Sequence, residues 1–151
     1  MNKNNQNKQV SASDSGTGEE AVRVVRYIGA GKIEEMMENG QYIEAFAHTQ
    51  LGIEKILWDR IVKIFEGEKA RKVREAIDKS REEKDKSPTS TFELIQWTHF
   101  LGAINDDEYS DLTDFNKKRN GIMHGHGQWW HLGEYKEALK KGIRFLNENG
   151  L

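Results

Sequence analysis

Apolar residues recur at helical spacing along most of the chain, and the clearest stretch runs from Tyr42 to Phe65. Spacings of three and four residues place side chains on one face of an α-helix. The apolar positions expected to form this face are 43, 46, 47, 53, 57, 61 and 64. At 1.5 Å per residue such a helix would be roughly 36 Å long. We therefore expect it to be the spine of the fold.

The chain before this helix divides into two parts. Residues 1–18 contain almost no apolar side chain, so burial cannot offset the entropy lost on ordering, and a disordered tail is predicted. The remainder, 19–151, is expected to be one domain. Its first helix is expected to begin at the capping box that starts with Thr17 and to end at Asn39-Gly40. The apolar positions of that helix are Val22, Val25, Ile33 and Met36.

Residues 66–86 have a different character, because fifteen of these twenty-one residues are charged. Acidic and basic side chains at close spacing favour an exposed helix. The opposite charges nearly cancel, so a solvated connecting helix is favoured over an RNA-binding arm.

The second half of the chain predicts three more helices. Ser90 and Glu93 have capping-box spacing, and the helix that follows is apolar on most sides, so we expect it to be deeply buried. Another helix is expected after Asn105, and a last one from Glu134 to Asn149. The apolar residues assigned to the first of these three are Phe92, Leu94, Ile95, Trp97, Phe100, Leu101 and Ile104.

These elements predict an all-α protein, an up-and-down helical bundle of four to five core helices plus one charged, exposed helix. A length of 151 residues suits one domain. The chain has no cysteine, which excludes disulfides and thiolate metal sites and fits a cytoplasmic location. No stretch reaches the roughly 20 apolar residues of a membrane span. The net charge of -2 gives no global attraction to nucleic acid.

The candidate chemistry lies in residues 114–127, which hold three consecutive cations, an amide and two histidines. Lysine and arginine bind phosphate without a metal, and histidine exchanges protons near neutral pH. Cleavage of RNA through its 2′-hydroxyl needs a group that takes a proton, a group that gives one and a cation that stabilises the phosphorane-like charge. The predicted catalytic residues are Arg119, Asn120 and His124, and the predicted substrate-binding residues are Lys117, Lys118 and His126.

The spacing of Arg119 and His124 constrains this site. On an unbroken helix, residues five positions apart lie about 140° apart around the axis. Either the helix ends near Gly121 to Gly125, or two chains pool their residues across a two-fold axis.

An arginine, a polar residue next to it and a histidine after four intervening positions resemble the signature of the HEPN (higher eukaryotes and prokaryotes nucleotide-binding) superfamily. The match includes the position of the motif, at the end of a late helix before the last one. The resemblance covers roughly residues 41–149, through the order of helices more than through identical residues. It implies a homodimeric bundle and a metal-independent endoribonuclease of toxin–antitoxin or defence systems, without a cofactor.

By this resemblance His124 would be the acid/base residue, Arg119 would bind phosphate and Asn120 would support the site. An acidic residue on an earlier helix, Glu44 or Glu54, would assist. RNA or a nucleotide would be the ligand, and an antitoxin-like protein would be a partner. The same bundle also serves in non-catalytic modules that bind nucleotide, RNA or protein.

Structural roles are the alternatives. Arg119 could pair with Asp111 or Asp114, and His124 could bond the last carbonyls of its helix. A zinc site built from His124, His126 and His131 is disfavoured, because a glycine-rich loop lacks the spacing and carboxylate support of such sites. The pair Trp129-Trp130 is expected to fill an interface rather than to stack on RNA.

Overall fold

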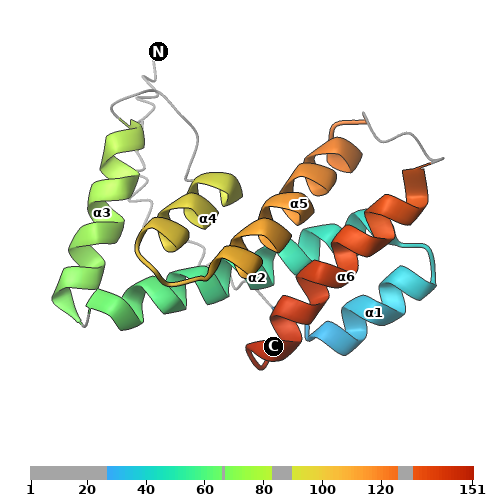
Figure 1. Ribbon diagram of the computed structural model, residues 1–151, viewed down its shortest axis with the longest axis horizontal. Coiled ribbons are helices and arrows are strands. Elements are labelled where there is room, and N and C mark those ends of the chain that lie inside the picture. Colours follow the sequence, from blue (N-terminus) through green and yellow to red (C-terminus); the bar gives the residue numbers. More distant parts are fainter. Residues whose placement is uncertain (1–26, 66, 83–89, 126–130) are drawn as a thin grey trace, which may run out of the picture.

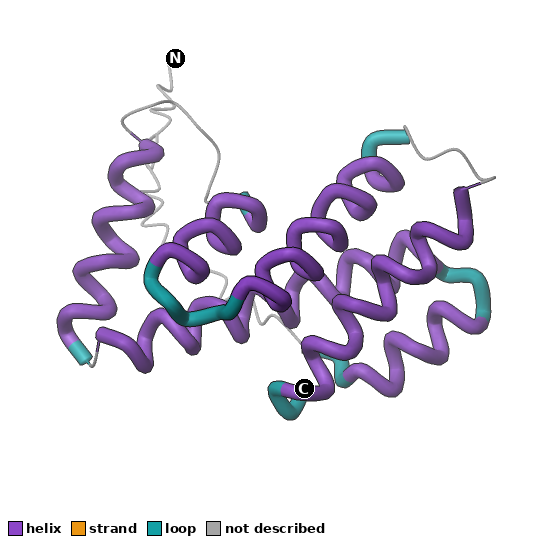
Figure 2. The backbone as a smooth tube through the Cα atoms, in the orientation of Figure 1, coloured by secondary structure: helices purple, strands orange, loops and turns teal. Residues whose placement is uncertain are grey.

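The computed structural model describes residues 27–65, 67–82, 90–125 and 131–151. Within these segments the chain forms six α-helices and no strand (Figures 1 and 2). They are α1 (Ala30–Glu38), α2 (Tyr42–Phe65), α3 (Glu68–Glu82), α4 (Thr91–Phe100), α5 (Asp106–Met123) and α6 (Leu132–Glu148). The predicted all-α bundle is confirmed. The expected tail over 1–18, the cap at Thr17 and the tryptophans at 129 and 130 lie outside the described residues.

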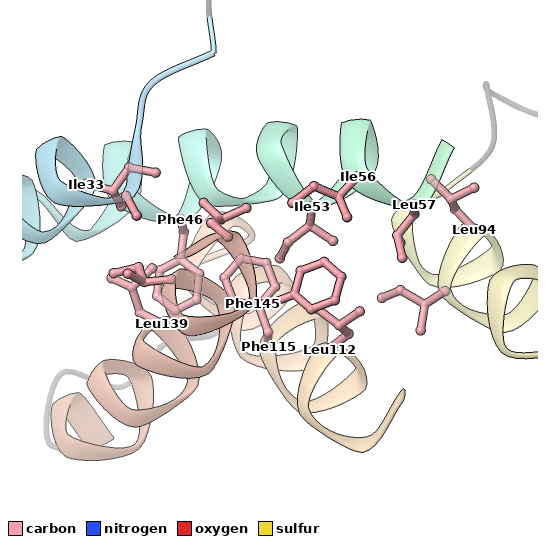
Figure 3. Close-up of a cluster of buried hydrophobic side chains, with 14 of the residues drawn as sticks. Ile33, Phe46, Ile53, Ile56, Leu57, Leu94, Leu112, Phe115, Leu139 and Phe145 are labelled. Carbon is pink, nitrogen blue, oxygen red and sulfur yellow. The ribbon is translucent and has the colours of Figure 1, made fainter. Parts of the chain in front are cut away.

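Helix α2 is the spine, as expected, and the bundle packs along it. Figure 3 shows Phe46, Ile53, Ile56 and Leu57 of α2 meeting side chains from α1, α4, α5 and α6. The fully or nearly buried positions of α2 are Ala45, Phe46, Thr49, Gly52, Ile53, Ile56, Leu57 and Ile61. Two residues assigned to the core face, Ile43 and Ile64, are instead exposed. They lie near the two ends of the helix, outside the span from Ala45 to Ile61 that contains its buried residues.

The closest approach in the core is made by α6 at Gly142. A Cβ atom built on Gly142 would lie 2.7 Å from Cγ2 of Thr49 on α2 and 2.8 Å from Cδ2 of Phe115 on α5. The Phe115 ring in turn packs on Phe46, with centroids 5.3 Å apart. Only glycine fits at this junction, because a side chain would overlap atoms from two other helices.

A single guanidinium joins four parts of the fold. Arg60 of α2 pairs with both carboxylate oxygens of Glu108, at 2.8 and 3.0 Å. It also donates to the carbonyl of Ala103 (3.0 Å) and to Oδ1 of Asn149 (2.9 Å). Its carbon Cζ lies 5.1 Å from the ring centroid of Phe145. Arg60 therefore ties α2 to the α4–α5 turn, to the first turn of α5 and to the end of α6.

The two ends of the described chain also meet. Helix α1 begins at Ala30, and its N-cap, Gly29, has no side chain to cap it. The Ala30 N–H donates to the carbonyl of Leu151 instead, at 3.3 Å. The expected longer helix is wrong over 27–29, where the described chain is not helical; Gly29 and Gly31 lower helix propensity there. The predicted end at Asn39-Gly40 is confirmed, with Gly40 at φ +77°.

Helix α3 is the charged, exposed helix that the sequence predicts. Among the described helices it packs only against α2, and in Figure 1 it stands at the far end of that helix. One anchor is Arg74, whose Cζ lies 4.9 Å from the ring centroid of Trp58. None of the described helices combines the length and hydropathy that crossing a membrane requires.

The caps predicted for α4 and α5 are present, but the expected deep burial of α4 is wrong. Ser90 accepts a hydrogen bond from the Glu93 N–H, and Asn105 forms a complete capping box with Glu108. Leu94 and Ile95 are buried, as expected. However, the aromatic side chains Phe92, Trp97 and Phe100 are exposed, Phe100 by 80%. Helix α4 packs on α2 and α5 through one face only, so its other face stays uncovered by described residues.

Replacing Arg60 by methionine should destabilise the fold by about 2–3 kcal/mol, because Glu108 would keep its charge in a largely buried place without its partner. Urea denaturation followed by circular dichroism measures the change. The matched control is Arg71→Met, which breaks an exposed pair with Glu75 and should cost less than about 0.5 kcal/mol. Equal effects of the two substitutions would contradict the role given to Arg60.

The contact between Arg60 and Glu108 should also make the stability of the fold depend on pH. Partial burial alone would raise the pKa of Glu108, but the hydrogen bonds from Arg60 and from the Asn105 N–H outweigh it and lower the pKa below 4.5. The stabilisation by this carboxylate is therefore complete above pH 4.5 and is lost as the pH falls through the lower folded pKa. Arg60→Met should lose less stability than the wild type over that window.

Gly142→Ala should destabilise the protein, whereas Gly31→Ala should stabilise it. Overpacking costs about 1–3 kcal/mol and exceeds the gain in helix propensity of about 1 kcal/mol. A Cβ on Gly31 meets nothing within 4 Å, so that substitution keeps the gain alone. Thermal unfolding of both variants compares the signs, and a higher unfolding temperature for Gly142→Ala would refute the close approach at Gly142.

Candidate functional site

Helix α5 places Arg119 at the end of its buried face. Leu112 and Phe115 point into the core, and Arg119 follows them at helical spacing. Its side chain is half-buried, and its Nε atom is buried without a hydrogen-bond partner among the described residues. Its Nη1 donates to Oδ1 of the neighbouring Asn120 at 2.9 Å. The guanidinium is therefore oriented by Asn120 but keeps an unused donor.

His124 lies where the helix ends. The helix is unbroken to Met123, and the His124 N–H still donates to the carbonyl of Asn120, at 3.1 Å. The backbone leaves the right-handed helical conformation for a left-handed one only at Gly125, which has φ +70°. The imidazole is exposed, and it has no hydrogen-bond partner within the described part of the chain. The structural alternative for His124 was a hydrogen bond from its side chain to the last carbonyls of α5. No such bond is found among the described residues.

The helix does end between Gly121 and Gly125, as one of the two arrangements requires, but its hydrogen bonding continues to the His124 N–H. Since no break in α5 separates Arg119 from His124, their side chains leave the helix about 140° apart. Asn120 lies between them and contacts both, through its side chain to Arg119 and through its carbonyl to His124. One chain therefore brings the three residues together in sequence but does not aim the guanidinium and the imidazole at one point.

The neighbouring lysines differ in their partners. Lys118 forms an ion pair with Glu134 of α6, and this hydrogen bond raises the pKa of Lys118 and lowers that of Glu134. Oε1 of Glu134 also forms a hydrogen bond with Nδ1 of His131, at 3.2 Å. The charge of Lys118 is thus already matched within the fold. Lys117 is exposed, and His126 lies outside the described residues.

Asp111 and Asp114, the two carboxylates considered as partners of Arg119, form ion pairs with cations of α6 instead. Lys141 pairs with Asp114 at 2.8 Å, and Arg144 pairs with Asp111 at 2.5 Å. These contacts run along the α5–α6 junction and hold the two helices side by side. The structure therefore shows no ion pair between Arg119 and either described aspartate.

The two acidic candidates on α2 are placed differently. Oε1 of Glu54 accepts from the hydroxyl of Thr91 (2.5 Å) and from the amide of Gln50 (2.8 Å), so Glu54 joins α2 to the start of α4. Glu44 is exposed in the first turn of α2, about 15 Å along the axis from Glu54. It shares a pocket with Ile122, near the end of α5. Of the two, Glu44 is the one that lies beside the candidate site.

That pocket is a feature that the sequence did not predict. It has a volume of about 300 Å³ and is lined by residues from the first turn of α2, the end of α5 and the start of α6. Its lining is mostly apolar and includes two tyrosines. The lining residues are Gly40, Tyr42, Ile43, Glu44, Ile122, Leu132 and Tyr135. Three separate segments supply them, so no local motif marks the pocket.

The described residues contain no group of histidine and carboxylate side chains arranged to hold a metal ion. Comparison with known proteins found no matching family model, no matching curated protein and no matching solved structure. The HEPN resemblance accordingly rests on the motif and its place in the bundle, and it stays a prediction.

Proposed function

We propose that the protein is a metal-independent endoribonuclease of HEPN type, active as a homodimer in which Arg119 of one subunit and His124 of the other act on the same phosphodiester. The observation that carries the proposal is the oriented Arg119–Asn120 pair near the exposed imidazole of His124, which lies at a helix end and has no hydrogen-bond partner among the described residues. Neither side chain is used to hold the described fold together.

The chemistry follows from these groups. The 2′-oxygen of the RNA attacks the adjacent phosphorus while an imidazole takes its proton. Arg119 stabilises the charge that grows on the phosphoryl oxygens. The bond from phosphorus to the 5′-oxygen breaks, and a second imidazole protonates that oxygen. The products are a 2′,3′-cyclic phosphate and a 5′-hydroxyl. Asn120 is a positioning residue, because it orients Arg119 without touching RNA.

A second copy of the chain is needed because the two groups diverge. Two-fold symmetry brings two arginines and two histidines into one cleft, and this supplies both the proton acceptor and the proton donor. A toxin or defence ribonuclease of this kind would act in the cytoplasm and would be held inactive by an antitoxin-like protein.

The alternative function is a non-catalytic module that binds RNA, nucleotide or protein. Two observations favour it: Lys118 is already paired with Glu134, and Arg119 and His124 diverge within one chain. Such a module would hold its ligand without turnover and would not need both residues.

Single substitutions test the catalytic proposal. In excess chelator, His124→Ala and Arg119→Ala should each lower the rate of single-stranded RNA cleavage at least about 100-fold, as expected for removal of an acid/base or charge-stabilising group. A fluorescent oligonucleotide measures the rate. The controls His99→Ala on α4 and Arg71→Ala on α3 should keep this rate. Unchanged cleavage in both site variants, with helicity retained, would end the proposal.

Mixing the two inactive variants tests the shared site. In a mixed dimer, the Arg119→Ala subunit keeps its histidine and the His124→Ala subunit keeps its arginine. The mixed dimer holds one arginine and one histidine from different subunits but lacks the second imidazole, so part of the activity should return on mixing, while each variant alone stays inactive. Subunit exchange is confirmed by a tag on one partner. Exchange without recovery of activity would show that Arg119 and His124 do not act across the dimer.

A further inference from the structure

We propose that the pocket beside Arg119 binds a guanine base of the RNA, next to the phosphate that Arg119 holds. The pocket is the one formed by Tyr42, Glu44, Ile122 and Tyr135 with their neighbours. This inference rests on the proposed ribonuclease function and adds a preference for one base to it.

The pocket opens on the arginine side of α5. Ile122, which lines it, follows Arg119 by three residues, so the two side chains lie about 60° apart around the helix axis and one turn apart along it. His124 projects from the other side. A nucleotide whose phosphate contacts Arg119 can therefore place its own base in the pocket.

The walls suit a flat aromatic ring. Tyr42 is half-buried and Tyr135 is 8% exposed, and both belong to the lining of the pocket. Bases of single-stranded RNA bind proteins by stacking on aromatic side chains. Lys136 lies beside the pocket, with Nζ 5.7 Å from the Tyr42 ring centroid, and adds positive charge for the RNA backbone.

The volume limits the ligand to a single base. Pockets for small molecules typically measure about 300–1,000 Å³, and this one lies at the lower end, at about 300 Å³. A base enters such a space, and the ribose and phosphate stay outside, towards α5.

Glu44 selects the base. It is the one ionisable acid in the lining, and an ionised carboxylate only accepts hydrogen bonds, with two oxygens side by side. Guanine offers two adjacent donors, N1–H and the 2-amino group, on its pairing edge. Adenine and cytosine place an acceptor beside their amino group, and uracil has one N–H between two carbonyls. Only guanine therefore satisfies both carboxylate oxygens without placing an acceptor against them.

Binding of the four nucleoside 3′-monophosphates to the full chain tests the proposal. The His124→Ala background removes turnover, and titration calorimetry measures affinity. Guanosine 3′-monophosphate should bind at least 10-fold more tightly than the other three. Glu44→Gln should abolish this preference, and Tyr42→Ala should weaken all four. The control Glu34→Gln, an exposed glutamate that lines a different hollow between α1 and α6, should change nothing.

The outcomes separate this inference from the ribonuclease proposal. Equal affinity for all four nucleotides, or a preference for guanosine that survives Glu44→Gln, overturns the pocket assignment whatever the cleavage data show. A Glu44-dependent preference for guanosine in a protein that never cleaves RNA keeps the pocket and refutes the enzyme. Cleavage that depends on Arg119 and His124 but ignores guanine keeps the enzyme and refutes the pocket.

Discussion

The arrangement of the bundle depends on how closely α6 approaches α2 and α5 at Gly142. The missing side chain lets Thr49 and Phe115 reach the α6 backbone, and Gly52 makes similar room on α2 for Leu146. Because α6 lies so close, the carboxylates Asp111 and Asp114 of α5 meet cations of α6 along the same junction. The position of α5, and with it the end that carries the candidate site, is fixed by packing at Phe115, about one turn before Arg119 and about two and a half turns before His124.

This rigidity determines what the candidate site is able to do alone. A firmly held α5 keeps its helical hydrogen bonds up to His124, so the histidine cannot swing towards Arg119 without breaking the last turn. In the proposed enzyme each chain would supply a half-site, with an oriented guanidinium on one side of α5 and a solvent-exposed imidazole on the other. Symmetry is the simplest way to complete such a half-site, since one rotation supplies every missing group at once.

The sequence predicted best what depends on neighbouring residues. The long helix from Tyr42, the cap at Asn105 and the last helix follow from the local sequence, and all are present. The prediction that α4 is deeply buried was wrong. The composition of a helix gives the number of its apolar residues but not how many of its faces contact other helices. The pocket at Tyr42 and Tyr135 and the contacts of Arg60 unite segments far apart in sequence, so no local pattern could reveal them. Glu54 also looked available, because its partner Thr91 lies 37 residues away.

The hydrogen bond between Ala30 and Leu151 has a consequence for how the ends of the bundle move. An isolated helix frays independently at each terminus, since its first N–H groups and last carbonyls face water. Here the last carbonyl supplies an acceptor that Gly29 cannot, so the opening of α1 and the loosening of the residues after α6 are a single event. We therefore expect amide hydrogens at these two places, 121 positions apart in the chain, to exchange as one cooperative unit.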